Sequence, residues 1–211
     1  MFIDIHTHHA DNKPNILEVI QMDPREFKMT VDKLFSLGVH PWETEDTEIC
    51  ESAFSALQSL IANGLIPFAI GECGLDKLRG GAIDFQIRVF EQQIQISEEL
   101  RIPLIIHCVK AWDELIHLYK KYKPKQPWII HGFRGKTQLA NQLLSYPNLF
   151  LSFGLSYNTD TWKSIPLNRV FLETDTVNQS IESIYYKAAK ERNIDLNDFI
   201  SQIECNFAYL R

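Results

Sequence analysis

Short apolar runs alternate with longer segments of helical period along most of the chain. Several of these runs are continuously apolar, which is typical of strands buried on both faces of a parallel sheet. The pattern predicts eight strands, over residues 2–6, 15–22, 33–39, 66–72, 103–108, 127–132, 149–153 and 169–175. Apolar residues at steps of three and four predict helices over residues 47–63, 83–101, 111–122, 136–146, 178–191 and 195–210.

Alternation of strand and helix predicts right-handed β-α-β units, and about eight strands favour an α/β fold of the TIM-like (β/α) barrel type. A doubly wound open sheet is the alternative. The connections at residues 9–14 and 23–32 are short and contain proline, so we expect no full helix there and a barrel distorted and shortened at its first βα units. No linker rich in Pro, Gly or Ser interrupts the chain, so we expect residues 1–211 to form a single domain.

Composition limits the class of protein. With 45% hydrophobic and 23% charged residues, the 211-residue chain suits an ordinary globular domain. A net charge of −6 excludes a general nucleic-acid coat, although metal ions or a few basic residues could still hold phosphate locally. The four cysteines include no CxxC and no close pair, which indicates reduced thiols and a cytoplasmic protein. We expect no membrane partner, because no apolar run approaches the ~18 residues of a span, and nothing indicates a protein partner.

Histidines and carboxylates stand at or just beyond the ends of the predicted strands. They are His6, His8, His40, Glu72, His107, His131 and Asp175. In a parallel barrel the strand C-termini line one mouth, where active sites are built, so these side chains are expected to converge. His6 and His8 are two residues apart and face the same side of a strand, whereas His9 faces away.

Imidazole and carboxylate together predict a divalent metal such as zinc or manganese, with magnesium less suited to the histidines. We predict metal ligation by His6, His8, Glu72, His107, His131 and Asp175. This set exceeds what one tetrahedral ion needs, and two ions roughly 3.5–4 Å apart would use it fully. His40 precedes Pro41 and Trp42 and is predicted to support a ligand or contact the substrate. Arg134 and Lys136 follow a predicted strand and are candidate phosphate contacts.

The motifs "DIHTHH", "GVHPW", "IGECGLD", "PLIIHC", "IIHGFRG" and "LETD", in this order, resemble the TatD family of metal-dependent hydrolases. The resemblance runs from residue 1 to about residue 176. It implies a TIM-like barrel with two metals and a deoxyribonuclease that releases nucleotides from DNA ends. It also implies that His6, His8 and Asp175 hold the first metal, that Glu72 bridges, and that His107 and His131 hold the second.

The resemblance further implies that Asp175 is the general base for a water nucleophile, with Glu72 as its catalytic partner at the metals. Three functions stay open at this point. The first is a 3′-5′ exonuclease-like deoxyribonuclease. The second is a two-metal hydrolase of a small phosphoester or amide-like substrate, which the shortened chain would favour because a reduced rim holds a polymer less well. The third is a barrel that binds metal without turnover.

Overall fold

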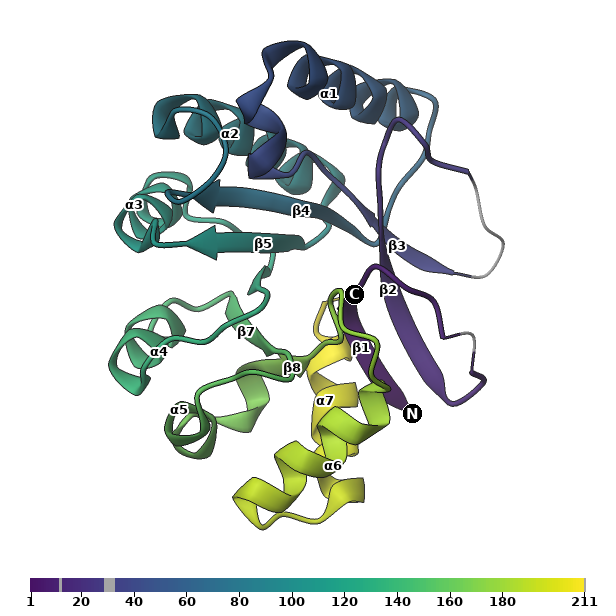
Figure 1. Cartoon of the computed structure of the whole chain (residues 1–211), viewed down its shortest axis with the longest axis vertical. Coiled ribbons are helices and arrows are strands. Elements are labelled where there is room, and N and C mark those ends of the chain that lie inside the picture. The colour runs from purple at the N-terminus through teal and green to yellow at the C-terminus, as the bar shows by residue number, and fades with distance from the viewer. Residues whose placement is uncertain (12, 29–32, 211) are drawn as a thin grey trace. The chain divides into compact units, whose positions relative to one another are not determined.

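The computed structural model describes residues 1–11, 13–28 and 33–210. Its strands are β1 (Phe2–Thr7), β2 (Ile16–Met22), β3 (Leu34–Leu37), β4 (Ala69–Asp76), β5 (Leu104–Val109), β6 (Trp128–Ile130), β7 (Leu149–Phe153) and β8 (Val170–Leu172) (Figure 1). Its α-helices are α1 (Thr47–Ala62), α2 (Ile83–Leu100), α3 (Trp112–Tyr122), α4 (Thr137–Leu144), α5 (Thr159–Ser164), α6 (Ile181–Arg192) and α7 (Leu196–Ala208). Two 3-10 helices are η1 (Pro41–Glu45) and η2 (Leu167–Arg169).

The strand order distinguishes between the two predicted architectures. The strands follow one another in the order β1 to β8, the order of the chain. The pairs β1–β2, β3–β4, β4–β5 and β7–β8 are parallel. A doubly wound sheet reverses its strand order at a switch point, and this order does not reverse. The predicted (β/α) barrel class is therefore confirmed.

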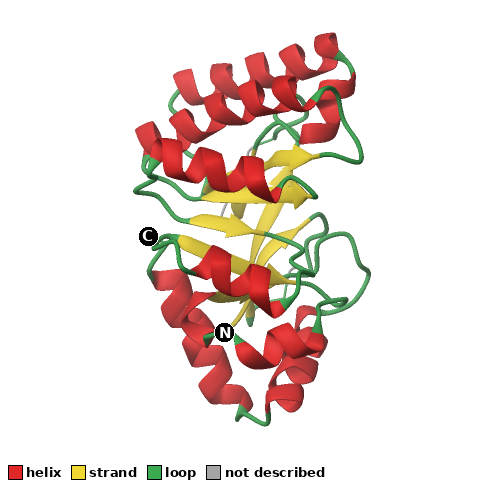
Figure 2. Cartoon of the chain, turned by 90° about the vertical axis from the view of Figure 1, so that its left-hand side faces the viewer, coloured by secondary structure: helices red, strands yellow, loops and turns green. Residues whose placement is uncertain are grey.

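Two compact units make up the chain. Unit 1 comprises Met1–Ile20 and Ile129–Arg211, and unit 2 comprises Gln21–Trp128. Unit 1 carries β1, β7, β8 and α4 to α7, whereas unit 2 carries β3 to β5 and α1 to α3. In unit 2, α1, α2 and α3 lie on one side of β4 and β5 (Figure 2).

Aromatic side chains fill the core of unit 1. Trp162, Phe199 and Tyr185 are almost fully buried, and their rings pack in sequence with centroids 5.6 and 5.3 Å apart. The Tyr185 hydroxyl accepts from the Ile3 N–H at 3.2 Å and donates to the Ile3 carbonyl at 3.0 Å. Helix α6 thus holds the start of β1, the strand that contains His6.

The eight residues of β4 are all buried, as expected for a strand covered on both faces. Gly74 has φ +136°, and a Cβ there would lie 2.1 Å from the His107 carbonyl oxygen. Only glycine fits this close approach of β4 to β5. The approach places Glu72 and Asp76, on either side of Gly74, beside His107.

The six predicted helices and eight predicted strands are present, with boundaries shifted by a few residues. In the described parts of the 9–14 and 23–32 connections there is no helix, as predicted. The pattern missed η1, α5 and η2, because segments of three to six residues are too short to display helical periodicity. Among the described residues, no helix is both long and apolar enough to cross a bilayer.

Gln93, on α2, offers a test of how the segment before His40 is held. Its buried amide accepts from the Val39 N–H at 2.7 Å and donates to the Val39 carbonyl at 3.1 Å. We expect Gln93→Leu to lower the free energy of unfolding by about 2–4 kcal/mol, because both buried backbone groups lose their partner. Urea denaturation would measure this. Gln95→Leu, at an exposed position of the same helix, should change it by less than about 0.5 kcal/mol.

Candidate metal centre and its carboxylate partners

In unit 1, the end of β1 is paired with the segment after β8. The Asp175 N–H donates to the His6 carbonyl and the His8 N–H donates to the Asp175 carbonyl, both at 3.0 Å. The Asp175 Oδ1 atom lies 3.7 Å from the Nε2 atoms of both His6 and His8. The two histidines therefore face one carboxylate, which confirms the same-side orientation predicted from their spacing. His6 is fully buried, whereas His8 is about one-third exposed.

Asp4 anchors the residue before Asp175. Its carboxylate accepts from the Thr174 N–H at 3.0 Å and from the Thr174 hydroxyl at 2.6 Å. The same hydroxyl lies 2.8 Å from the Thr7 hydroxyl. Burial raises the pKa of Asp4 to about 8, although the bonds from Thr174 oppose the shift. This buried network fixes the backbone that turns through Asp175, whose φ is +55°.

His131 follows β6 and faces a second buried carboxylate in unit 1. Its Nδ1 lies 3.5 Å from Oε1 of Glu173, and the Gly132 N–H donates to the same oxygen at 2.6 Å. Glu173 is fully buried, which opposes ionisation, but His131, with smaller contributions from His6 and Ser152, outweighs burial and lowers the pKa of Glu173. The His131 ring lies 4.5 Å from the His6 ring, centroid to centroid. Glu173 therefore orients His131, whose ring lies beside that of His6.

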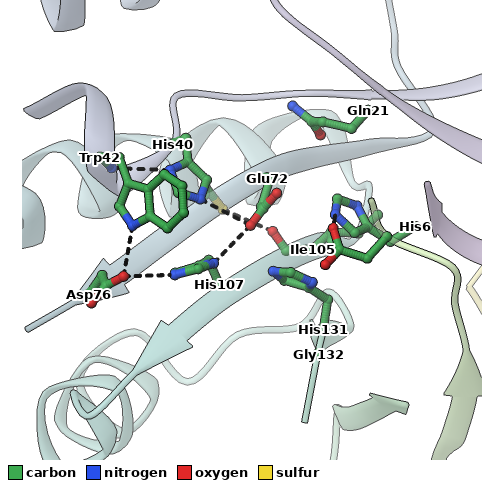
Figure 3. A network of polar contacts seen from close by, with 12 residues as sticks. His6, Gln21, His40, Trp42, Glu72, Asp76, Ile105, His107, His131 and Gly132 are labelled. Atoms are coloured by element: carbon green, nitrogen blue, oxygen red, sulfur yellow. Dashed lines mark hydrogen bonds and ion pairs between the residues drawn. The ribbon is translucent and has the colours of Figure 1, made fainter. Parts of the chain in front are cut away.

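In unit 2, Glu72 is held between two histidines (Figure 3). Its Oε1 lies 2.8 Å from Nδ1 of His107 and 3.0 Å from Nε2 of His40. The Nδ1 atom of His40 accepts from the Trp42 N–H at 3.1 Å. Neutral His40 therefore carries its proton on Nε2 and donates it to Glu72, an assignment that follows from the hydrogen-bond network.

Asp76 holds the opposite edge of His107 in unit 2. Its Oδ2 accepts from the Trp42 indole N–H at 2.7 Å and lies 3.1 Å from the His107 Nε2. Its Oδ1 accepts from the backbone N–H groups of Leu78 and Arg79. Burial opposes ionisation of Asp76, but these donors outweigh it and lower the pKa. His107 thus has one carboxylate at each ring nitrogen.

The donor chemistry of each unit fits a divalent metal. In unit 1, one ligand atom from each of His6, His8 and Asp175 lies within 4.8 Å of the others. In unit 2, the same holds for His40, Glu72 and His107. Imidazole nitrogen and carboxylate oxygen are the donors that zinc and manganese accept. Each unit therefore has a cluster that could hold a metal ion.

The predicted site residues divide between the units. His6, His8, His131 and Asp175 belong to unit 1, whereas Glu72 and His107 belong to unit 2. The predicted substrate contacts Arg134 and Lys136 are exposed in unit 1, and His9 is exposed as well. His40, predicted as a supporting or substrate-contacting residue, lies with Glu72 and His107.

Two carboxylates escaped prediction, Asp76 and Glu173. Both stand inside motifs that were recognised, "GECGLD" and "LETD", next to proposed ligands. Alternation places residues 72 and 76 on the same face of β4, and this could have indicated Asp76. Glu173 is two residues before the proposed ligand Asp175, and alternation places both on the same face. Nothing in the sequence therefore separated an orienting acid from a proposed ligand.

The fold and these clusters define a class: a (β/α) barrel with histidines and carboxylates at its strand ends. The chain matches the family described as TatD related DNase over residues 7–208. It belongs to this family. The resemblance noted in the sequence is thereby confirmed.

Similar proteins are named as nucleases. A human 3′-5′ RNA nuclease, TATDN2, is 36% identical over 118 residues, covering 51% of this chain and 16% of that protein. A fission yeast (Schizosaccharomyces pombe) deoxyribonuclease Tat-D is 27% identical, covering 66% and 50%. The 3′-5′ ssDNA/RNA exonuclease TatD of a Rahnella species is 30% identical, covering 65% and 55%. The chain therefore spans about half or less of the length of these relatives.

Two solved structures support the fold across nearly the whole chain. A TatD homologue from Escherichia coli superposes with a TM-score of 0.80 at 18% identity, covering 99% of this chain and 97% of the other. A TatD family hydrolase from Entamoeba histolytica gives a TM-score of 0.79 at 17% identity, with the same coverage. At such identities the likeness establishes the shared fold.

Asp76→Ala tests the network around His107. We expect the free energy of unfolding at pH 7 to fall by about 2–4 kcal/mol, because the indole and two backbone donors lose a charged acceptor. The lowered pKa means that Asp76 stabilises the fold above its unfolded pKa of 3.8, and that this contribution disappears as the pH falls through the folded value. The difference between wild type and variant in urea denaturation should therefore narrow below about pH 4. Glu99→Ala, at an exposed position on α2, should show no comparable loss.

Proposed function

We propose that the chain is a metal-dependent phosphodiesterase that removes nucleotides from the ends of DNA, as a 3′-5′ exonuclease. The observation that carries the proposal is the cluster in which His6 and His8 face Asp175. Membership of the TatD related DNase family and the names of the relatives support it. Cytoplasmic location is part of the same proposal and rests on the sequence alone.

We assign one divalent ion, zinc, manganese or magnesium, to each cluster. The unit 1 cluster offers two imidazoles and a carboxylate, and the unit 2 cluster offers Glu72 and His107 with His40 beside them. The Nε2 proton of His40 is directed at Glu72, which supports a role in orienting that carboxylate more than ligation. That Glu72 bridges two ions, and that His107 and His131 share the second, stay predictions from the sequence.

Bound divalent ions would supply a hydroxide nucleophile near neutral pH and offset the charge of the transition state. The residues of the chain position the groups and accept the proton. Asp175 is the group that takes the proton, and its backbone is held on both sides by His6 and His8, so its carboxylate starts in a fixed position. Asp4 and Thr174 restrain the same turn.

Substrate phosphate needs further positive charge. Arg134 and Lys136 are exposed on the loop between β6 and α4, and we assign them to phosphate contact. His40 stays a predicted substrate contact in addition to its bond with Glu72. A small phosphoester or amide-like substrate is the alternative outcome of the experiments below, because the chain spans only part of its nuclease relatives.

The direct test is degradation of 5′-labelled single-stranded DNA with manganese or magnesium. We expect stepwise shortening from the 3′ end, and a rate reduced by about 10²–10⁴-fold in Asp175→Asn, because the amide cannot take a proton. Asp160→Asn, an exposed acid on α5, is the matched control and should cleave like the wild type. Equal rates for wild type and Asp175→Asn would contradict the mechanism. No shortening by a metal-loaded protein would favour the small substrate.

Metal affinity tests the unit 1 cluster independently of activity. His8→Ala should weaken zinc or manganese binding by more than the ~10–100-fold that loss of an outer-shell partner costs, because a direct ligand is removed. His9→Ala replaces the neighbouring exposed histidine and should leave the affinity unchanged. Calorimetric titration of EDTA-treated, dialysed protein would measure both. Equal losses in the two variants would refute the assignment of His8.

A further inference from the structure

Arg79 lies on the loop between β4 and α2 in unit 2, and its side chain is 55% exposed. Its guanidinium carbon lies 3.8 Å from the centroid of the Trp42 ring, which is a cation–π stack. Within the described part of unit 2, the one ion pair of its guanidinium is with Glu45, at 3.9 Å between Nε and Oε1. A pair so long and so exposed contributes little. The guanidinium of Arg79 is therefore held in place by Trp42, and most of its N–H groups remain available to a ligand.

The Trp42 indole and the Arg79 backbone N–H both donate hydrogen bonds to the Asp76 carboxylate. The indole beneath its guanidinium donates to Oδ2 of Asp76, and the Arg79 backbone N–H donates to Oδ1 of the same residue. Asp76 also contacts His107, as Figure 3 shows. The cation is thus positioned by the same network that orients a candidate metal ligand. An arginine without these supports would lose more rotamer entropy on binding an anion.

The loop around Arg79 borders a hollow of about 510 Å³, lined by residues 76–83 and Gln86. This lies within the range of sites that take small organic groups. The Trp42 ring contacts both groups, with the His107 ring centroid at 5.7 Å and the Arg79 guanidinium carbon at 3.8 Å from its own centroid. An anion on Arg79 would therefore be a neighbour of a group at His107.

We propose that Arg79, braced by Trp42, binds a backbone phosphate of a nucleic-acid strand adjacent to the phosphate that is cleaved. This inference rests on the proposed nuclease function and adds a substrate contact to it. A planar guanidinium matches a phosphodiester through two parallel N–H bonds. A small phosphoester has no second phosphate to place there, so Arg79 contributes to recognition of a strand and not of a small ester.

Binding is measured by fluorescence anisotropy of a labelled dT12 oligonucleotide in EDTA, which prevents hydrolysis, at several salt concentrations. Arg79→Ala should weaken binding about tenfold, because one charge-assisted contact is lost. It should also reduce the slope of log K against log salt by about 0.7. Arg79→Lys keeps the charge but loses the fork, so binding should weaken about threefold with the slope unchanged.

Arg88→Ala is the matched control. It removes an exposed arginine that stands over the Phe85 ring in the same unit, and so changes the net charge equally. Binding should stay within twofold of the wild type. Equal losses in Arg79→Ala and Arg88→Ala would overturn the proposal, as would unchanged binding in Arg79→Ala or a wild type that binds no oligonucleotide.

A small phosphodiester separates strand recognition from contact with the cleaved phosphate. With bis(4-nitrophenyl) phosphate and manganese, Arg79→Ala should keep kcat/KM within twofold while KM for the oligonucleotide rises about tenfold. An equal loss on both substrates would place Arg79 at the cleaved phosphate and refute the proposal. A wild type that binds the oligonucleotide through Arg79 but cleaves nothing would refute the proposed function alone. Cleavage of DNA with no effect of Arg79 would refute this inference alone.

Discussion

Two backbone hydrogen bonds carry the unit 1 cluster: Asp175 N–H to the His6 carbonyl, and His8 N–H to the Asp175 carbonyl. They join the first and last strands of the sheet order, and they bring a carboxylate from residue 175 to histidines at residues 6 and 8. Further hydrogen bonds restrain β1 on one side of this pairing and the segment before Asp175 on the other. Tyr185 holds β1 through Ile3, and Asp4 holds Thr174. The positive φ of Asp175 is tolerated because these contacts determine the turn.

Carboxylates that face histidines recur in both units, with a similar physical purpose. A histidine can bind a metal through either ring nitrogen, and a carboxylate at the other nitrogen selects the tautomer and the orientation. Glu173 does this for His131, and Asp76 for His107. Both acids have lowered pKa values despite burial, because donors around them outweigh desolvation. They remain charged at neutral pH, as the orienting role requires.

The Asp76 network that contacts His107 also supports Arg79. The Asp76 carboxylate accepts a hydrogen bond from the Trp42 indole N–H, and the Arg79 guanidinium stacks on the Trp42 ring. A chain with a net charge of −6 cannot attract a polyanion by its overall field. Individually positioned cations, together with bound metal ions, are the physical means by which such a chain can hold phosphate.

The sequence by itself determined the strand–helix alternation, the barrel class, and the set of histidines and acids at the strand ends. Periodicity and strand-end position are local properties, and both survive folding unchanged. Only the tertiary structure decided that His40 donates to Glu72, and that Asp76 and Glu173 orient neighbouring histidines. It alone placed Arg79 on Trp42, 37 positions earlier in the chain. Such pairings depend on which rotamers and loops meet after the strands assemble, and no local pattern of residues encodes those distances.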